Sequence, residues 1–462
     1  SDTITATAAN PNATLGALTA TGTVTVAPAV LGAIQWVSTT PADSQIALAG
    51  AGGSETATVV FKVTDTTGGP VANQSVTFSL ETTVGGLTLT PTTATTGTDG
   101  SVQTIVHAGT LHGTARVKAT TTKSGTTIFT VSPGIVISTG IPAQDRFSLS
   151  LSAHDVQGFD LDGTTVTVTA RLADRFGNPA ADGTTVSFTA NGGHIDPSCI
   201  TTGATGTCSV TWTSANPRPT ATSLSVLGHA EILAYTTGEE HFDDVNGDGV
   251  FDATDTFTKD STGNTVGVFS WLEDPTIDDI GEVYLDANEN GKYDSGEFFF
   301  DFNKDSIRNG PDHTYHGFGC IGTSTVTCST NTTLGIGEQD CVVMASDGIV
   351  IVQDNNTTTQ AVGSTLLYDV YDVNGNAPPA GEKFGIIATS ATVSVLQTTA
   401  NDSSCAASAP GTVTNGSGAT VGNGAIQISV SVASTSSPGS FLITATDPVT
   451  GTINYSATIT VP

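Results

Sequence analysis

Positive charge is scarce in this sequence: 462 residues include only 13 lysines and arginines, against 43 aspartates and glutamates. The formal net charge is −30 and the sequence pI is about 4.1. Phosphate binding needs clustered basic side chains, so this composition excludes nucleic acid as a partner. It disfavours attraction to an anionic membrane surface for the same reason.

Long apolar runs are missing as well. No run approaches the roughly twenty apolar residues that a membrane helix requires, so we expect no membrane insertion in this segment. Methionine occurs once, and the strong helix formers are few, whereas threonine and valine abound. This balance predicts an all-β chain. The sequence begins at Ser1 without methionine, so we expect that a leader was removed or that the segment belongs to a longer protein.

Recognisable catalytic patterns are lacking too. There is no G-x-S-x-G elbow or phosphate loop, and no CxxC spacing of a zinc site. Only D-H-T-Y-H at 312–316 gathers histidines, and we interpret it as a surface loop rather than a transition-metal site. The sequence does not exclude a glycosidase site with two catalytic carboxylates, because acidic residues are numerous. Their spacing, described next, has a better explanation, and we expect no enzyme.

The acids concentrate in one stretch, Asp243–Asp312, which holds 18 of the 43 against four basic residues. From Asp244 the chain reads D-V-N-G-D-G-V-F-D-A-T-D, and from Asp286 it reads D-A-N-E-N-G-K-Y-D-S-G-E. Both runs fit the twelve-residue calcium loop, which has oxygen ligands at alternate positions and glycine at position 6. The predicted calcium ligands are Asp244, Asn246, Asp248, Val250, Asp252 and Asp255 in the first loop, and Asp286, Asn288, Asn290, Lys292, Asp294 and Glu297 in the second.

A third run starts at Asp301 and has Ser306 where the template has glycine. It is either a further calcium loop or a solvated acidic loop, and both readings stay open. Its candidate ligands are Asp301, Asn303, Asp305 and Asp312.

Six cysteines allow fifteen pairings. Cys199 and Cys208 flank T-T-G-A-T-G, and Cys320 and Cys328 flank I-G-T-S-T-V-T, so each pair can close a short hairpin. By elimination the third bridge joins Cys341 to Cys405. Disulfides predict an oxidising, extracellular location.

Outside the acidic stretch, alternating apolar and polar residues predict strands about ten residues apart, as in a β-sandwich. One signature recurs three times: a strand ending in aspartate, a turn with glycine, a proline, and a strand with phenylalanine. Its residues are Asp65, Gly68, Pro70 and Phe78; Asp174, Gly177, Pro179 and Phe188; and Asp372, Gly375, Pro378 and Phe384. We predict a terminal hairpin of a preceding or partner domain at 1–28 and sandwiches at 29–140, 141–345 and 346–462. The second carries the acidic insertion at about 240–318.

These motifs resemble the group 1 bacterial immunoglobulin-like domains of intimin- and invasin-type adhesins. The resemblance covers most of the chain outside the insertion. It implies seven-stranded immunoglobulin-like sandwiches packed end to end, in a stalk or adhesive role at the bacterial cell surface. The insertion is similar to the calcium loops of dockerins and thrombospondin type 3 repeats. Its flanks do not read as amphipathic helices, which favours a structural role for calcium.

The first functional hypothesis is a calcium-stiffened structural or adhesive protein of the bacterial surface. Its expected partners are other surface proteins, a host or glycan receptor, or copies of itself in a filament joined by the terminal hairpin. The alternative is a carbohydrate-binding accessory region of a larger secreted enzyme, with Trp271 beside the acidic loops as the residue that would stack on a sugar.

Overall fold

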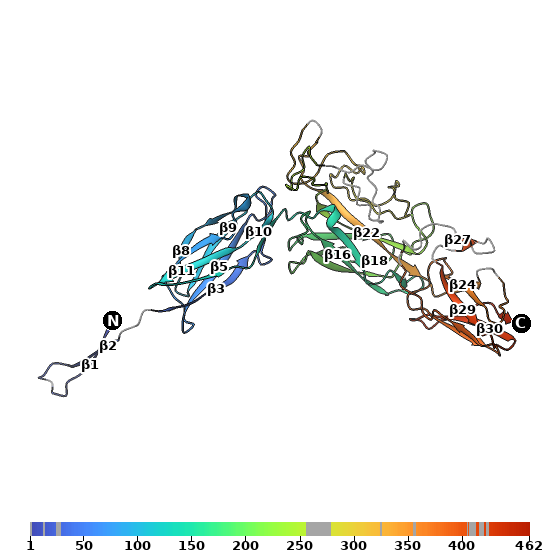
Figure 1. Ribbon diagram of the computed structural model, residues 1–462, viewed down its shortest axis with the longest axis horizontal. Helices are drawn as coiled ribbons and strands as arrows, with labels where there is room; N and C mark the ends of the chain where they lie inside the picture. Colours follow the sequence, from blue (N-terminus) through green and yellow to red (C-terminus); the bar gives the residue numbers. More distant parts are fainter. Residues whose placement is uncertain are drawn as a thin grey trace. The chain divides into compact units, whose positions relative to one another are not determined.

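A computed structural model describes residues 2–12, 14–24, 29–255, 279–323, 326–353, 357–403, 405, 413–414, 420–421 and 425–462. Apart from two short 3-10 turns, Val84–Gly86 and Gln144–Arg146, the regular structure of these residues is strand. The predicted all-β fold class is therefore confirmed. Within the same residues, no helix is long and apolar enough to cross a membrane. The chain divides into two compact units, Ser1–Ile137 and Ser138–Pro462 (Figure 1).

The first unit begins with an antiparallel hairpin of β1 (Asp2–Ala8) and β2 (Leu18–Val24), whose strand residues are all exposed. A β-sandwich follows, with sheets β3-β5-β9-β7 and β12-β11-β6-β8 and a short sheet β10-β13-β4. Phe61 and Phe78 from the two larger sheets meet in its core, with ring centroids 5.9 Å apart. The strands are β3 (Leu31–Thr40), β4 (Gln45–Ala47), β5 (Thr56–Asp65), β6 (Ser75–Leu80), β7 (Thr88–Thr90), β8 (Thr93–Thr95), β9 (Ser101–His107), β10 (Gly113–Ala115), β11 (Val117–Lys123), β12 (Thr126–Val131) and β13 (Ile135–Ser138).

The second unit starts with a sandwich of sheets β14-β16-β20-β18 and β15-β22-β21-β17-β19. Trp212 is fully buried in its core, and its indole N–H donates to the Gly192 carbonyl at 2.9 Å. The strands are β14 (Phe147–Leu151), β15 (Asp155–Gln157), β16 (Thr165–Leu172), β17 (Thr185–Ala190), β18 (His194–Ile195), β19 (Ser198–Ile200), β20 (Thr207–Thr213), β21 (His229–Gly238) and β22 (Leu334–Ala345).

The same unit continues into another sandwich, with sheets β23-β24-β29-β26 and β25-β30-β31, where β32 also pairs with β30. Tyr368, Phe441 and Ile443 are buried in its core. The strands are β23 (Ile349–Gln353), β24 (Thr365–Asp372), β25 (Lys383–Ala388), β26 (Val393–Val395), β29 (Ile426–Val432), β30 (Gly439–Thr446), β31 (Ile453–Tyr455) and β32 (Ile459–Val461), with a separate ribbon of β27 (Val413–Thr414) and β28 (Thr420–Val421).

One turn recurs in each sandwich, at Asp65, Asp174 and Asp372. In all three, Oδ1 of the aspartate accepts the backbone N–H groups two and four residues later, at 2.8–3.0 Å. The glycine three residues later has φ between 80° and 89°, a conformation that other residues adopt only with strain. The D-x-x-G signature is therefore a turn closed by the aspartate side chain.

The acidic stretch lies between two neighbouring strands. β21 and β22 pair antiparallel over ten residues, from His229↔Val343 to Gly238↔Leu334. The excursion between them covers 239–333, longer than the predicted 240–318. β22 begins before the alternating pattern around Asp340 indicated, because the first part of this strand is buried on both faces.

All six cysteines are paired. The bridges are Cys199–Cys208, Cys320–Cys328 and Cys341–Cys405, which confirms the preferred connectivity. The first links β19 to β20, the second lies within the excursion, and the third ties β22 to the sandwich that follows it.

Candidate functional site

The first acidic loop, Asp244–Asp255, is closed by hydrogen bonds from its backbone to its own carboxylates. Asp244, at loop position 1, accepts the N–H groups of positions 5 and 6 at 3.2 and 2.8 Å. Asp255, at position 12, accepts the N–H groups of positions 2 and 9 on separate oxygens, each at 2.9 Å. The two ends of the loop therefore fold toward each other and gather their oxygens.

The second loop, Asp286–Glu297, repeats these contacts. Asp286 accepts the N–H groups of positions 5 and 6 at 3.1 and 2.7 Å. Glu297 accepts those of positions 2 and 9 at 3.0 and 2.8 Å. Positions 4 and 6 have positive φ in both loops. Two different sequences thus adopt one conformation.

The third loop, from Asp301, has the same first half. Asp301 accepts the N–H groups of positions 5 and 6 at 3.0 and 2.9 Å. Ser306 stands at position 6 with φ of 65°, so it takes the conformation that glycine has in the other loops. The missing glycine does not prevent the fold of this loop.

The closing carboxylate of the third loop comes from outside it. Glu282 accepts the N–H of Phe302 (position 2) at 2.9 Å and that of Asn309 (position 9) at 3.0 Å, on separate oxygens. These are the contacts that Asp255 and Glu297 make in their loops. Asp312, the candidate at position 12, instead accepts the N–H of Thr314 at 2.9 Å. Sequence reasoning missed Glu282 because it precedes the run it closes.

The middle positions also repeat. Asn246, Asn288 and Asn303, at position 3, each accept the N–H of position 5 at 2.9–3.2 Å. The side chain at position 5 then accepts the N–H of position 7 at 2.8 Å in every loop; these acceptors are Asp248, Asn290 and Asp305, and two of the donors are the predicted residues Val250 and Lys292. The arrangement gathers side-chain oxygens, the ligand type that calcium prefers.

Position 9 differs between the first two loops. Asp252 accepts the N–H and hydroxyl of Thr254, and these bonds hold the pKa of Asp252 below its usual value. Asp294 accepts the side-chain amides of Asn288 and Asn290, which lower its pKa likewise. Burial instead raises the pKa of Asp286, so that carboxylate pays a desolvation cost. A bound cation would offset that cost.

Arg175, in the D-R-F-G turn of the second sandwich, fastens the first loop to the sandwich. Its guanidinium donates to the Gly249 carbonyl at 2.9 Å, the Phe318 carbonyl at 2.7 Å and the Tyr315 hydroxyl at 2.9 Å. Beneath it lies a small apolar cluster of buried rings and the Cys320–Cys328 bridge: Phe242, Phe251, Tyr315 and Val326. The loop is thus held against the sandwich and not suspended in solvent.

Two buried glutamates just after β21 hold the returning chain. Glu240 accepts the N–H groups of Ile280 and His316 at 2.9 and 2.7 Å, and Glu239 accepts that of Phe318 at 3.1 Å. Burial raises the pKa of each glutamate to about 7, although Arg175 and His316 oppose the shift. These contacts are structural.

The second loop rests on the outer face of β21 and β22. Leu233 packs there against Val283, Leu285 and Ala287, all buried. Gln339 of β22 accepts the Asp286 N–H at 2.9 Å and donates to the Asp286 carbonyl at 2.9 Å. This coverage explains why β21 is buried on both faces.

The histidines of D-H-T-Y-H do not converge. The His313 side chain is 72% exposed and lies 3.1 Å from Asp279, whereas the imidazole of His316 lies 3.3 Å from Glu240. The two rings therefore contact different carboxylates.

No protein-family model matches this sequence, and no curated protein does. Among solved structures, the D0-D1 domain of intimin is 18% identical, with 44% of this chain and 90% of that chain covered, at a TM-score of 0.21. The Yersinia pseudotuberculosis adhesin InvE is 18% identical, with 44% and 54% covered, at a TM-score of 0.18. Domains 4–9 of the surface layer protein SbsC are 13% identical, with 100% and 69% covered, at a TM-score of 0.20. Likenesses at this level carry no argument about function.

Proposed function

We propose that this chain is a non-enzymatic structural or adhesive protein of the bacterial surface, in which calcium fills the three acidic loops and stiffens the insertion. One observation carries the proposal: Asp244, Asp286 and Asp301, at position 1 of the three loops, accept the same pair of backbone N–H groups, those of positions 5 and 6. Acidic runs that were merely solvated would have no reason to share that conformation.

Charge supports the same proposal. The stretch Asp243–Asp312 has 18 acidic and four basic residues, which leaves a net charge of −14. Three calcium ions would neutralise six of these charges. Arg308 stacks on Tyr284, with its guanidinium carbon 4.7 Å from the ring centroid. We infer a site that needs calcium as its counter-ion, with an affinity of roughly 10⁻⁴ to 10⁻³ M, as in extracellular modules.

The extracellular setting is supported by the pairing of all six cysteines, since disulfides persist in oxidising compartments. The proposed partners are a host or glycan receptor, other surface proteins, or copies of the chain. The hairpin β1–β2 supports the last of these, because Ile4 and Leu18 are 61% and 54% exposed in a two-stranded sheet that is marginal alone.

A carbohydrate-binding role gains no support from the described tryptophans. Trp212 is buried in the core, and Trp36 is 39% exposed, with its indole N–H donated to Thr39 at 3.1 Å. Trp271, the candidate beside the acidic loops, lies outside the described residues.

Calorimetric titration with millimolar calcium tests the proposal. We expect calcium to bind all three loops, and we expect Asp244→Ala and Asp286→Ala each to remove one site, because each deletes the position-1 carboxylate, which accepts the N–H groups of positions 5 and 6. Asp2→Ala, in the exposed hairpin, is the control and should leave the stoichiometry unchanged. Absence of binding heat, or full binding by both loop variants, would refute the calcium role.

Glu282 gives a sharper prediction about the third loop. We expect Glu282→Gln to abolish calcium binding there, because the amide cannot supply the bidentate carboxylate of position 12. Asp312→Asn should leave binding within about twofold of the parent, since its carboxylate closes a neighbouring turn instead. The measurement is the stoichiometry of each variant by titration. If Asp312→Asn loses the third site and Glu282→Gln retains it, then Asp312 is the ligand at position 12, as the twelve-residue spacing predicts, and Glu282 is not.

A further inference from the structure

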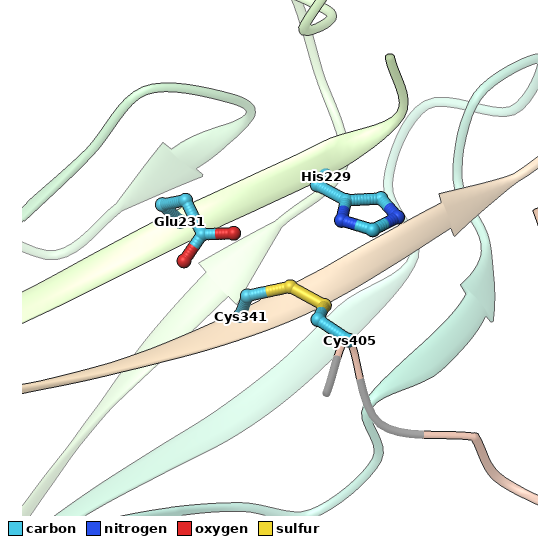
Figure 2. A group of neighbouring side chains, drawn as sticks. All are labelled: His229, Glu231, Cys341 and Cys405. Carbon is cyan, nitrogen blue, oxygen red and sulfur yellow. A yellow bond between two sulfur atoms is a disulfide. The ribbon is translucent and has the colours of Figure 1, made fainter. Parts of the chain in front are cut away.

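A second group of ligand-type side chains lies beneath the second calcium loop, away from the loop oxygens. His229 and Glu231 extend from one face of β21, and Cys341 lies on β22 beside Glu231, its partner across the ladder (Figure 2). Cys405 reaches the group through its disulfide with Cys341. One ligand atom from each of the four lies within 4.8 Å of the others.

Glu289 of the second loop enters the same group. It occupies loop position 4 with φ of 59°, and its carboxylate is in direct contact with Nδ1 of His229. Its side chain points into the protein, whereas the neighbouring Asn288 and Asn290 serve the calcium loop. The buried group therefore joins β21 to the loop that covers it.

Each carboxylate of this group has one oxygen without a hydrogen-bond partner. His229, Glu231 and Glu289 are 1%, 3% and 8% exposed, yet Oε1 of Glu231 and Oε2 of Glu289 accept no hydrogen bond. The other oxygen of Glu231 accepts the Gln339 amide at 2.7 Å. No ion pair among the described residues links either glutamate to lysine or arginine. Each of these buried carboxylates keeps one oxygen without a donor, and His229 is the only basic side chain paired with either of them among the described residues. Such burial is costly, so a positive species belongs between the two carboxylates.

We propose that His229, Glu231 and Glu289 bind one divalent transition-metal ion of the zinc type. Imidazole nitrogen with carboxylate oxygens is a zinc donor set, whereas calcium prefers six to eight oxygens. The Cys341–Cys405 disulfide lies beside the site. It supplies no ligand, because thiolates bind metal and disulfides do not. The ion would pin the second calcium loop to β21.

The test uses the full chain with its disulfides intact, freed of metal and then titrated with zinc in saturating calcium. We expect one zinc ion per chain. Glu231→Gln and Glu289→Gln should each weaken zinc binding about 100-fold or more, because even residues that only support ligands change affinity 10–100-fold. His229→Gln should do the same. His194→Gln, an exposed histidine on β18, is the matched control and should bind zinc normally.

Cobalt substitution distinguishes this site from two alternatives: metal binding by the cysteine thiolates, and a proton shared by the glutamates without any metal. With intact disulfides we expect a cobalt spectrum of nitrogen and oxygen ligands without a thiolate charge-transfer band. A thiolate band, with binding only after reduction, would overturn the assignment in favour of the cysteines. The assignment would also be overturned if the chain binds no stoichiometric zinc and the folded Glu231→Gln and Glu289→Gln variants are at least as stable as the parent. That result would mean that the two glutamates share a proton. Each variant is checked for folding by calcium binding to the first loop.

Discussion

Removal of calcium should loosen the three loops while the sandwiches stay folded. At about 10 mM calcium, and with an affinity of 10⁻⁴ to 10⁻³ M, each occupied loop gains about 1.4–2.7 kcal/mol. Hydrogen exchange at 244–255, 286–297 and 301–312 should therefore accelerate about 10- to 100-fold when calcium is chelated. Exchange in β5 and β24, which lie in sandwich cores, serves as the internal reference.

Magnesium is the control ion for that experiment. It requires a smaller octahedral site and holds its water tightly, so equal magnesium should protect the loops little. Identical exchange with and without calcium would show that backbone hydrogen bonds alone hold the loops. Loss of protection in β24 as well would show instead that calcium stabilises the whole unit.

Deletion of the Cys341–Cys405 bridge should destabilise the sandwich that follows it. The bridge closes a loop of 64 residues, for which the loop-entropy relation gives about 4 kcal/mol. We expect the double variant Cys341→Ala/Cys405→Ala to unfold β24 and β30 at lower denaturant, as followed by hydrogen exchange. Alanine is the right substitution, because both positions are buried and apolar.

The bridge Cys199–Cys208 provides the matched control. Its loop spans only nine residues, so its loss should cost about 2.6 kcal/mol, and the effect should fall on β19 and β20. If Cys199→Ala/Cys208→Ala destabilises β24 as much as Cys341→Ala/Cys405→Ala does, the Cys341–Cys405 bridge does not specifically stabilise the later sandwich.

The architecture could be predicted because its signals are local. Alternation along β5 and β16 marks strands with one buried face, and Asp65, Asp174 and Asp372 mark the same turn three times. β21 also forms in a segment that the sequence indicates as a strand, although nearly all of its residues are buried because the insertion covers its outer face. Apolar and polar residues alternate along a strand only where one face is buried and the other is exposed to solvent.

The contacts of the acidic loops also depend on whether their partners are close in sequence. In the first two loops, the carboxylates at positions 1 and 12 accept backbone N–H groups from within one run of twelve residues. In the third, Glu282 comes from an earlier segment, and only the fold brings it to Phe302 and Asn309. No spacing rule within the run identifies it.

The group around His229 was missed for a related reason, because its members come from distant segments. One signal was present: His229 and Glu231 alternate on one face of a strand whose other residues are uncharged. Ionisable residues in such a strand suggest that the face is buried against polar partners instead of water.

The register of β21 and β22 has a mechanical consequence. Gly238 and Leu334 face each other across the ladder, so the chain leaves the sheet and returns to it at the same rung. A pull on the two ends of the protein is transmitted through that ladder and bypasses residues 239–333 while the ladder holds. Once the ladder ruptures, residues 239–333 could extend and lengthen the chain by roughly 300 Å. The insertion is thus a length of chain that carries no load while the ladder is intact.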